Sequence, residues 1–157
     1  MEEKFKNLPL RNGVGIIVLN NKNKVFVAKR IDNPKDFWQM PQGGIDDGED
    51  FIQAAYRELE EETSIKNVEL IKEIEGTLTY ELPDNLLGII WKGKYKGQKQ
   101  KWFVVRFEGE ENEININTKH PEFLDWKWVN IDNLTDEVVE FKIHVYKQIK
   151  KELYKII

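Results

Sequence analysis

The sequence contains no cysteine among its 157 residues, which excludes disulfide bonds and thiolate metal sites. It also lacks any apolar run near the roughly 20 residues that a membrane-spanning helix requires. Residues 1–10 contain no apolar core of the kind found in export signals, and we therefore expect a soluble, cytoplasmic protein with no membrane partner. The only two histidines, His120 and His144, stand in no pattern that assigns either of them a role.

Length and composition predict one small enzyme domain spanning residues 1–157. A hydrophobic content of 40% is enough to build a single core in a chain of this length. There are no internal repeats and no low-complexity linker. The formal charge of −4 argues against broad coating of nucleic acid, so DNA is not an expected partner. The oligomeric state stays open, with a monomer favoured.

Apolar periodicity predicts a mixed arrangement of strands and helices. Residues 14–19 and 25–28 are apolar runs separated by Asn20-Asn21-Lys22-Asn23, which indicates a hairpin. A helix is predicted after Asp50, whose spacing to Gln53 is typical of a capping box. Its buried stripe is expected to contain Phe51, Ile52, Ala55 and Leu59. Further strands are expected within residues 68–82, 101–107 and 123–129, and an amphipathic helix is expected over residues 138–153.

Three carboxylates stand out on the predicted helix after Asp50. Glu58, Glu61 and Glu62 fall within one arc of about 100° on the helix surface. Like charges at this spacing destabilise a helix unless cations lie among them. Carboxylate oxygens suit Mg²⁺ or Mn²⁺ better than Zn²⁺, so the patch is a candidate metal site. Taken alone, three glutamates on a helix more often form an ordinary solvated face, and this is the favoured interpretation of the three by themselves.

A longer motif, residues 43–65, places these glutamates in a fixed pattern. It runs from Gly43 and Gly44 through Glu49 to Arg57-Glu58-Leu59 and Glu61-Glu62, and it ends with Ser64-Ile65. This spacing resembles the signature of the Nudix hydrolases, with Ser64 in place of the usual glycine. The resemblance implies the Nudix fold, an α+β architecture in which a mixed central β-sheet forms an α/β/α sandwich with its helices.

The motif of residues 43–65 is called the Nudix box. Segments outside this box narrow the resemblance to one branch of the family. Residues 11–15 (RNGVG), 38–44 (WQMPQGG), 97–103 (GQKQKWF), 121–123 (PEF) and 138–142 (VVEFK) resemble the bacterial RNA pyrophosphohydrolases. That branch is also described as dinucleoside polyphosphate hydrolases. The resemblance covers nearly the whole chain and implies hydrolysis of a 5′ polyphosphate by water.

The resemblance also implies roles for particular residues. Two or three Mg²⁺ or Mn²⁺ ions would be held by Glu58, Glu61 and Glu62, with the Gly43 carbonyl as a further ligand. Glu122 resembles the distal carboxylate of the family, which approaches the same metal site from outside the box. Glu62 is favoured as the general base, with Glu122 second. Arg57 is expected to orient the site by pairing with Glu49. A plain loop position remains the alternative for Glu122.

Substrate phosphates require cations, and residues 91–101 (WKGKYKGQKQK) carry five lysines and no acid. Lysines interleaved with Trp91 and Tyr95 suit an RNA end, because amines bind phosphates and rings stack on bases. A solvated loop is the simpler alternative. The resemblance adds further contacts, including base stacking by a ring that could equally be a core residue, Phe141. The predicted substrate-binding residues are Arg11, Arg30, Lys99, Lys101, Phe141 and Lys142.

Three functions remain open from the sequence. The favoured one converts 5′-triphosphate or diphosphate RNA ends to 5′-monophosphates and so initiates RNA decay. A rival with the same chemistry cleaves diadenosine tetraphosphate-type molecules, and the acids Glu81 and Asp84 favour it because they lower the positive charge near the expected substrate rim. The third is a nucleotide sensor without catalysis, which the complete set of box carboxylates disfavours.

Overall fold

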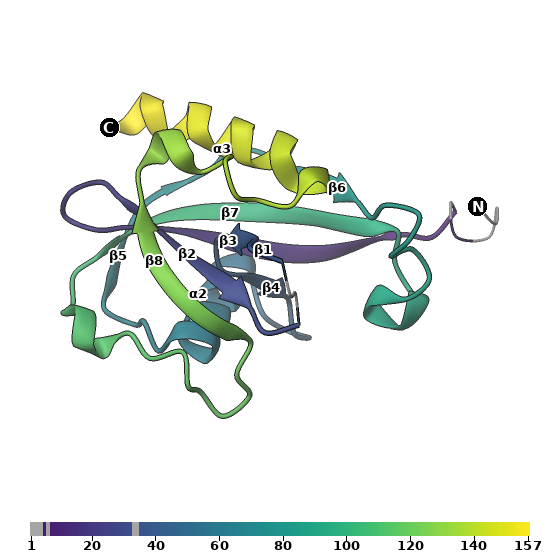
Figure 1. The fold of residues 1–157 in the computed structure, drawn as a ribbon, viewed down its shortest axis with the longest axis horizontal. Coiled ribbons are helices and arrows are strands. Elements are labelled where there is room, and N and C mark those ends of the chain that lie inside the picture. The colour runs from purple at the N-terminus through teal and green to yellow at the C-terminus, as the bar shows by residue number, and fades with distance from the viewer. Residues whose placement is uncertain (1–4, 6, 33–34) are drawn as a thin grey trace.

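Two helices enclose a mixed β-sheet in the computed structural model, which describes residues 5, 7–32 and 35–157 (Figure 1). The elements are β1 (Leu10–Leu19), β2 (Val25–Arg30), β3 (Trp38–Gln39), β4 (Gln42–Gly44), α2 (Phe51–Thr63), β5 (Val68–Glu73), β6 (Leu78–Glu81), β7 (Gly97–Phe107), β8 (Phe123–Val129) and α3 (Ile143–Ile156). Short 3-10 turns lie at residues 90–93, 111–113, 131–133 and 140–142. Neither described helix is long and apolar enough to cross a membrane.

Within the described residues, eight strands form one sheet. The central order is β3-β2-β1-β7-β5, while β4 pairs with β1, β6 with β7 and β8 with β2. β1 and β7 run parallel, from the pair Leu10 and Gly97 to the pair Leu19 and Arg106. The other pairings are antiparallel. The predicted mixed sheet is therefore confirmed.

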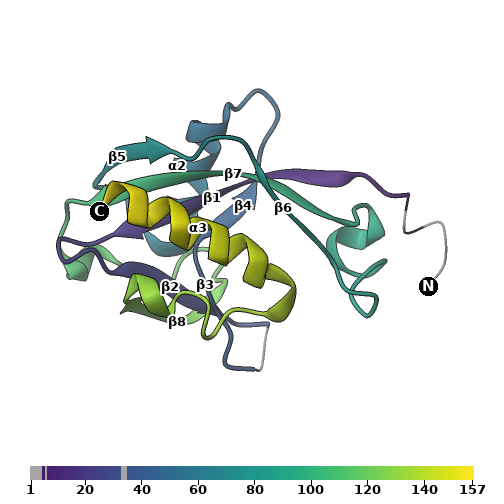
Figure 2. The same ribbon diagram turned by 90° about the horizontal axis from the view of Figure 1, so that it is seen from above.

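The sheet has a core on each of its faces, which explains why residues 14–19 are continuously apolar. On β1, Ile17 and Leu19 pack in the cluster that contains the α3 residues Tyr146 and Ile149. The alternate residues of the strand pack with Leu59 and the alanines of α2. A strand covered on both faces buries every side chain. Figures 1 and 2 show α3 and α2 on opposite sides of the sheet, so the α/β/α sandwich is confirmed.

β1, β2 and β7 extend beyond their predicted ranges, and two other predicted elements differ more from the structure. The region 68–82 is not continuous strand, because a turn at residues 74–77 separates β5 from β6, and both strands pair with β7. The C-terminal helix begins only at Ile143. Val139 is extended, with φ −60° and ψ 142°, and a 3-10 turn at residues 140–142 precedes the helix. The apolar spacing of residues 138–141 therefore comes from packing before the helix starts.

The capping of α2 agrees with the sequence, but its buried face is rotated from the predicted one. Asp50 accepts a hydrogen bond from the Gln53 amide, and the Gln53 side chain accepts one from the Asp50 amide. The expected burial of Phe51 is wrong, since it is 43% exposed. Ala54 is buried beside Ala55 and Leu59 instead. This rotation turns Glu62 into the interior, where it is only 3% exposed.

Ser64, which stands in place of the usual glycine, ends α2 in the left-handed conformation. Its φ is 67°, its amide donates to the Glu60 carbonyl, and its hydroxyl donates to the Asn115 carbonyl at 2.8 Å. We expect Ser64→Gly to be more stable than Ser64→Ala by about 1 kcal/mol, because both lose the hydroxyl bond and only glycine relieves the backbone. Urea unfolding of the two variants measures the difference. Equal stabilities would contradict a strained helix end.

Candidate active site

Arg57 links the glycine-rich loop to the carboxylates of α2. Its Nε and Nη2 donate to the two oxygens of Glu49 at 2.6 and 2.9 Å, and Nη2 also donates to the Gly44 carbonyl at 3.0 Å. Nη1 donates to Glu58 at 3.0 Å and to Glu61 at 3.2 Å. Hydrogen bonds from Arg57 lower the pKa of Glu49. The predicted pairing of Arg57 with Glu49 is present, and it holds loop and helix in one register.

Glu58 lies directly against the backbone of Gly43 on β4. A Cβ atom added at Gly43 would be 2.1 Å from the Glu58 carboxyl carbon, so any other residue there would displace the Glu58 carboxylate. Burial raises the pKa of Glu58, while the guanidinium of Arg57 opposes that shift. The carboxylate is thereby fixed between the Gly43 strand and the helix.

Glu62 is a buried carboxylate with no hydrogen-bond partner for either oxygen among the described residues. Burial raises its pKa well above the ordinary value, and the neighbouring charges of Glu122 and Glu58 raise it further. A buried charge without a partner is costly, so its retention calls for a cation or a proton. Glu61 differs, because its side chain is 59% exposed.

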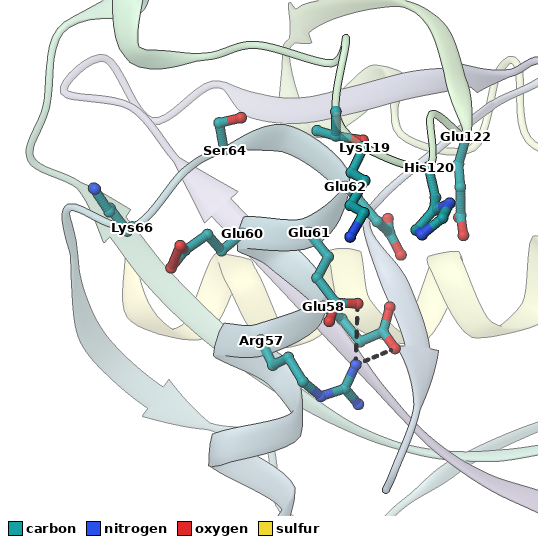
Figure 3. A pocket seen from close by; sticks show the side chains of 11 residues that line it. Arg57, Glu58, Glu60, Glu61, Glu62, Ser64, Lys66, Lys119, His120 and Glu122 are labelled. Carbon is teal, nitrogen blue, oxygen red and sulfur yellow. Dashed lines mark hydrogen bonds and ion pairs between the residues drawn. The ribbon is translucent and has the colours of Figure 1, made fainter.

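A cavity of about 960 Å³ opens beside these glutamates. In Figure 3, Glu122 and His120 reach from the loop before β8 towards Glu62, whereas Glu60 and Lys66 point away from this group. The Glu122 carbonyl accepts a hydrogen bond from the Ile31 amide at 2.9 Å, which anchors the loop. The cavity is lined by Arg57, Glu58, Glu60, Glu61, Glu62, Ser64, Lys66, Thr118, Lys119, His120 and Glu122.

Two predicted substrate cations lie near the carboxylates. Arg30 donates to Asp32 at 2.8 and 3.0 Å, and its Nη1 lies 3.8 Å from the Glu122 carboxylate. Lys142 is only 7% exposed, with its Nζ 5.1 Å from the centre of the Tyr80 ring. Burial, followed by the charge of Arg30, lowers the pKa of Lys142 to about 7. An anion bound between the two cations would relieve this cost.

Phe141 and the lysines of β7 have different surroundings. Phe141 is partly buried and packs against Tyr80, with ring centres 5.6 Å apart. The Lys101 amine donates to the carbonyls of Ile74 and Gly76 at 2.7 and 3.0 Å. This contact makes Lys101 a support of the turn at residues 74–77, and its contact with the substrate stays a prediction. Lys99 is exposed on the same side of β7 as Lys101.

A buried polar network that was not predicted from the sequence lies on the other side of β7. Gln98 and Gln100 are 0% and 1% exposed. The Tyr80 hydroxyl donates to Gln98 at 2.9 Å, and Gln100 donates to Gln42 at 3.0 Å. The Gln98 amide also reaches the Gly43 carbonyl, at 3.5 Å. A signal was available, because Gln98 and Gln100 alternate in step with the apolar Trp102 and so belong to a buried face.

The family model for the NUDIX domain matches residues 9–149, and the chain belongs to this family. The chain is 69% identical over 157 residues to an RNA pyrophosphohydrolase of Pelagibacter ubique, covering 100% of this chain and 99% of the relative. It is 51% identical over 146 residues to an RNA pyrophosphohydrolase of Rhodospirillum rubrum, covering 93% and 88%.

Solved structures support the same fold. The dihydroneopterin triphosphate pyrophosphohydrolase of E. coli superposes with a TM-score of 0.71 at 23% identity, covering 93% of this chain and 99% of that one. An Ap4A hydrolase of C. elegans superposes with a TM-score of 0.67 at 19% identity, with coverages of 93% and 99%. At these identities the two structures establish the architecture alone.

Nudix hydrolases generally need a divalent metal ion, and the residues here fit one chemically. The fit rests on Glu62, whose two buried oxygens have no partner among the described residues. Hard oxygen donors of this kind suit Mg²⁺ or Mn²⁺. In the described part of the chain, no group of three or more histidine, cysteine or acidic residues is arranged to hold an ion.

Proposed function

We propose that this chain is a metal-dependent pyrophosphohydrolase that converts 5′-triphosphate or 5′-diphosphate RNA ends to 5′-monophosphates. The observation that carries the proposal is the setting of Glu62, an unpartnered buried carboxylate that shares its cavity with Glu58 and Glu122. Arg30, whose Nη1 lies 3.8 Å from the Glu122 carboxylate, adds a positive charge for a phosphate. The names of the 69% and 51% identical relatives support RNA as the substrate. Residues 1–157 would act as one catalytic domain.

The proposed metal ligands are the carboxylates of Glu58, Glu61, Glu62 and Glu122, with the Gly43 carbonyl beside them. Two or three Mg²⁺ or Mn²⁺ ions would neutralise phosphate charge and lower the pKa of the attacking water. Arg57 orients Glu58 and Glu61 through the hydrogen bonds of Nη1. Glu61 is the more exposed of these ligands, so it has the most freedom to turn towards an ion.

The proposed reaction needs a general base for the attacking water and cations for the phosphates. Water attacks a phosphorus atom of the 5′ polyphosphate, and Glu62 accepts the proton of that water as general base. The bridging P–O bond at that phosphorus breaks, so that pyrophosphate leaves a triphosphate end, or phosphate leaves a diphosphate end, and a 5′-monophosphate remains. Its position suits Glu62 for this role, because its buried carboxylate lines the cavity that it shares with Glu58 and Glu122. Glu122 faces the same cavity and is the second candidate for the base. Arg30 and Lys142 bind the phosphates, and Phe141 offers a ring for the first base.

Of the two acids at the expected substrate rim, Glu81 has a lysine partner and Asp84 has no ion pair among the described residues. Glu81 lies 3.5 Å from Lys96, so its negative charge is partly balanced within the protein. Its side chain is also exposed, which weakens its effect on a phosphate further away. The cleavage of diadenosine tetraphosphate-type molecules remains the alternative, and it uses the same carboxylates.

The test is a side-by-side turnover assay on triphosphorylated RNA and diadenosine tetraphosphate at equal concentration with Mg²⁺. We expect higher kcat/KM for RNA and a steep rise of its KM between about 50 and 200 mM salt, because lysines and arginines displace counterions. Phe141→Ala should lower kcat/KM for RNA by about 5- to 100-fold, the loss of one base stack. A tenfold preference for the dinucleotide, with Phe141→Ala silent on RNA, would transfer the assignment to the alternative.

A further inference from the structure

The segment between β6 and β7 contains an unusual backbone. Trp91 and Lys92 both have positive φ, at 56° and 59°, and neither is glycine. The segment is fixed at its end, where the Leu82 amide donates to the Lys96 carbonyl and the Lys96 amide donates to Pro9. Two consecutive left-handed residues with side chains are unfavourable and persist only where the surroundings hold them. This conformation determines where the Trp91 ring lies.

It places the Trp91 ring over the guanidinium of Arg11. The Arg11 Cζ lies 5.5 Å from the centre of the ring, which is a cation–π contact. Tyr95 packs edge-on against the same ring at 6.1 Å, and Trp91 also packs on the core cluster that contains Tyr80 and Leu82. The sequence suggested that the rings of this segment stack on bases. The structure instead places Trp91 against a side chain of the protein.

Arg11 in turn lies against the box. A Cβ atom added at Gly44 would be 2.1 Å from Arg11 Nη2, so the guanidinium packs on the Gly44 backbone. The Gly44 carbonyl accepts the hydrogen bond of Arg57 that orders the carboxylates. Among the residues that the structure describes, no carboxylate forms an ion pair with Arg11. The guanidinium is therefore held by a ring and a glycine, and neither contact uses an N–H donor.

We propose that Trp91 is a positioning residue that holds Arg11 ready to bind the polyphosphate of the substrate. A carboxylate partner would also fix Arg11, but it would occupy the donors and cancel the charge. An aromatic face fixes the plane of the guanidinium and leaves its N–H donors and its positive charge available for the paired oxygens of a phosphate. The inference rests on the proposed function for the identity of the substrate and extends it to a residue outside the box.

The experiment is a double-mutant cycle on Trp91 and Arg11. We expect Trp91→Leu to raise KM for triphosphorylated RNA about tenfold with kcat nearly unchanged, because the ring acts on binding. In the Arg11→Gln background, Trp91→Leu should add almost nothing. Trp91→Phe should restore most of the affinity. Trp128→Leu is the matched control, since Trp128 packs on Phe26 and Phe107 in the other cluster, and its KM should equal that of the wild type.

Two outcomes would overturn the proposal. One is an unchanged KM in folded Trp91→Leu. The other is a rise of KM on Trp91→Leu that is equally large in the wild-type and Arg11→Gln backgrounds. Should Trp91→Leu not fold, Trp91→Met replaces it, because it fills volume without an aromatic face. Calorimetric binding of inorganic tripolyphosphate with Mg²⁺ repeats the cycle without catalysis. If the wild type does not hydrolyse RNA, the proposed function fails, while coupling between Trp91 and Arg11 in tripolyphosphate binding still supports or refutes the positioning role.

Discussion

Glu62→Gln is expected to lower kcat for triphosphorylated RNA at least about 10²-fold while leaving the fold intact. The substitution keeps the shape of the side chain and removes its charge, so it removes both a metal ligand and the proposed base. Steady-state kinetics at saturating Mg²⁺ measures the loss. The loss is expected in kcat, because the charge of Glu62 acts on the reacting water rather than on remote parts of the substrate.

The same substitution should stabilise the protein when metal is removed. Glu62 has a raised pKa, so its neutral form contributes stability at low pH, and this contribution is lost as pH rises through the raised value. Glutamine does not ionise and escapes the loss. In EDTA, the thermal unfolding midpoint, Tm, of Glu62→Gln should therefore match that of the wild type at about pH 4. At about pH 8 it should exceed the wild-type Tm by a few degrees. Adding Mg²⁺ should stabilise the wild type more than the variant.

Glu60→Gln is the matched control for both measurements. Glu60 lines the same cavity from the same helix, but it is exposed and points away from Glu62 (Figure 3). Its kcat should stay within about twofold of the wild type, as for most surface substitutions. Retained turnover in Glu62→Gln, or an equal loss in Glu60→Gln, would mean that the chemistry does not depend on the buried carboxylate.

Much of the architecture could be predicted from the sequence, because local patterns determine it. The hairpin after Leu19 follows from two apolar runs and an Asn-rich turn, and β8 matches its predicted range of 123–129. The cap at Asp50 depends on residues only three positions apart. The start of the last helix was misplaced because Val138 and Phe141 pack on the core from a non-helical backbone. Apolar spacing records burial and does not by itself record the backbone conformation.

The contacts of the site that join residues close in sequence could be predicted, and those that join distant residues could not. The pairing of Arg57 with Glu49 is encoded within the box, so the motif contains it. The contact between Arg11 and Trp91 joins residues 80 positions apart, and only the path of the segment before β7 brings them together. The burial of Gln98 depends likewise on which face of β7 is covered. The contact of Lys101 with the turn at residues 74–77 was likewise not visible in the basic run of residues 91–101.

Glu122→Gln should lower kcat about 10²-fold with little change in KM, which is the signature of a group that acts mainly in the transition state. The loop should keep its place, because its anchor to the Ile31 amide is the backbone carbonyl of Glu122. The carboxylate lies 3.8 Å from Arg30, so a purely electrostatic role through Arg30 must be distinguished.

Arg30→Lys makes that distinction, because it keeps a positive charge but loses the guanidinium that approaches Glu122. If Glu122 acts through Arg30, then Arg30→Lys and Glu122→Gln should share one effect on KM, and combining them should add little. If Glu122 acts on the reacting water or on a metal ion, the kcat loss of Glu122→Gln should persist in full when Arg30 is lysine. We expect the second result, because Glu122 faces Glu62 across the cavity (Figure 3). An unchanged kcat in Glu122→Gln would return this residue to a plain loop position.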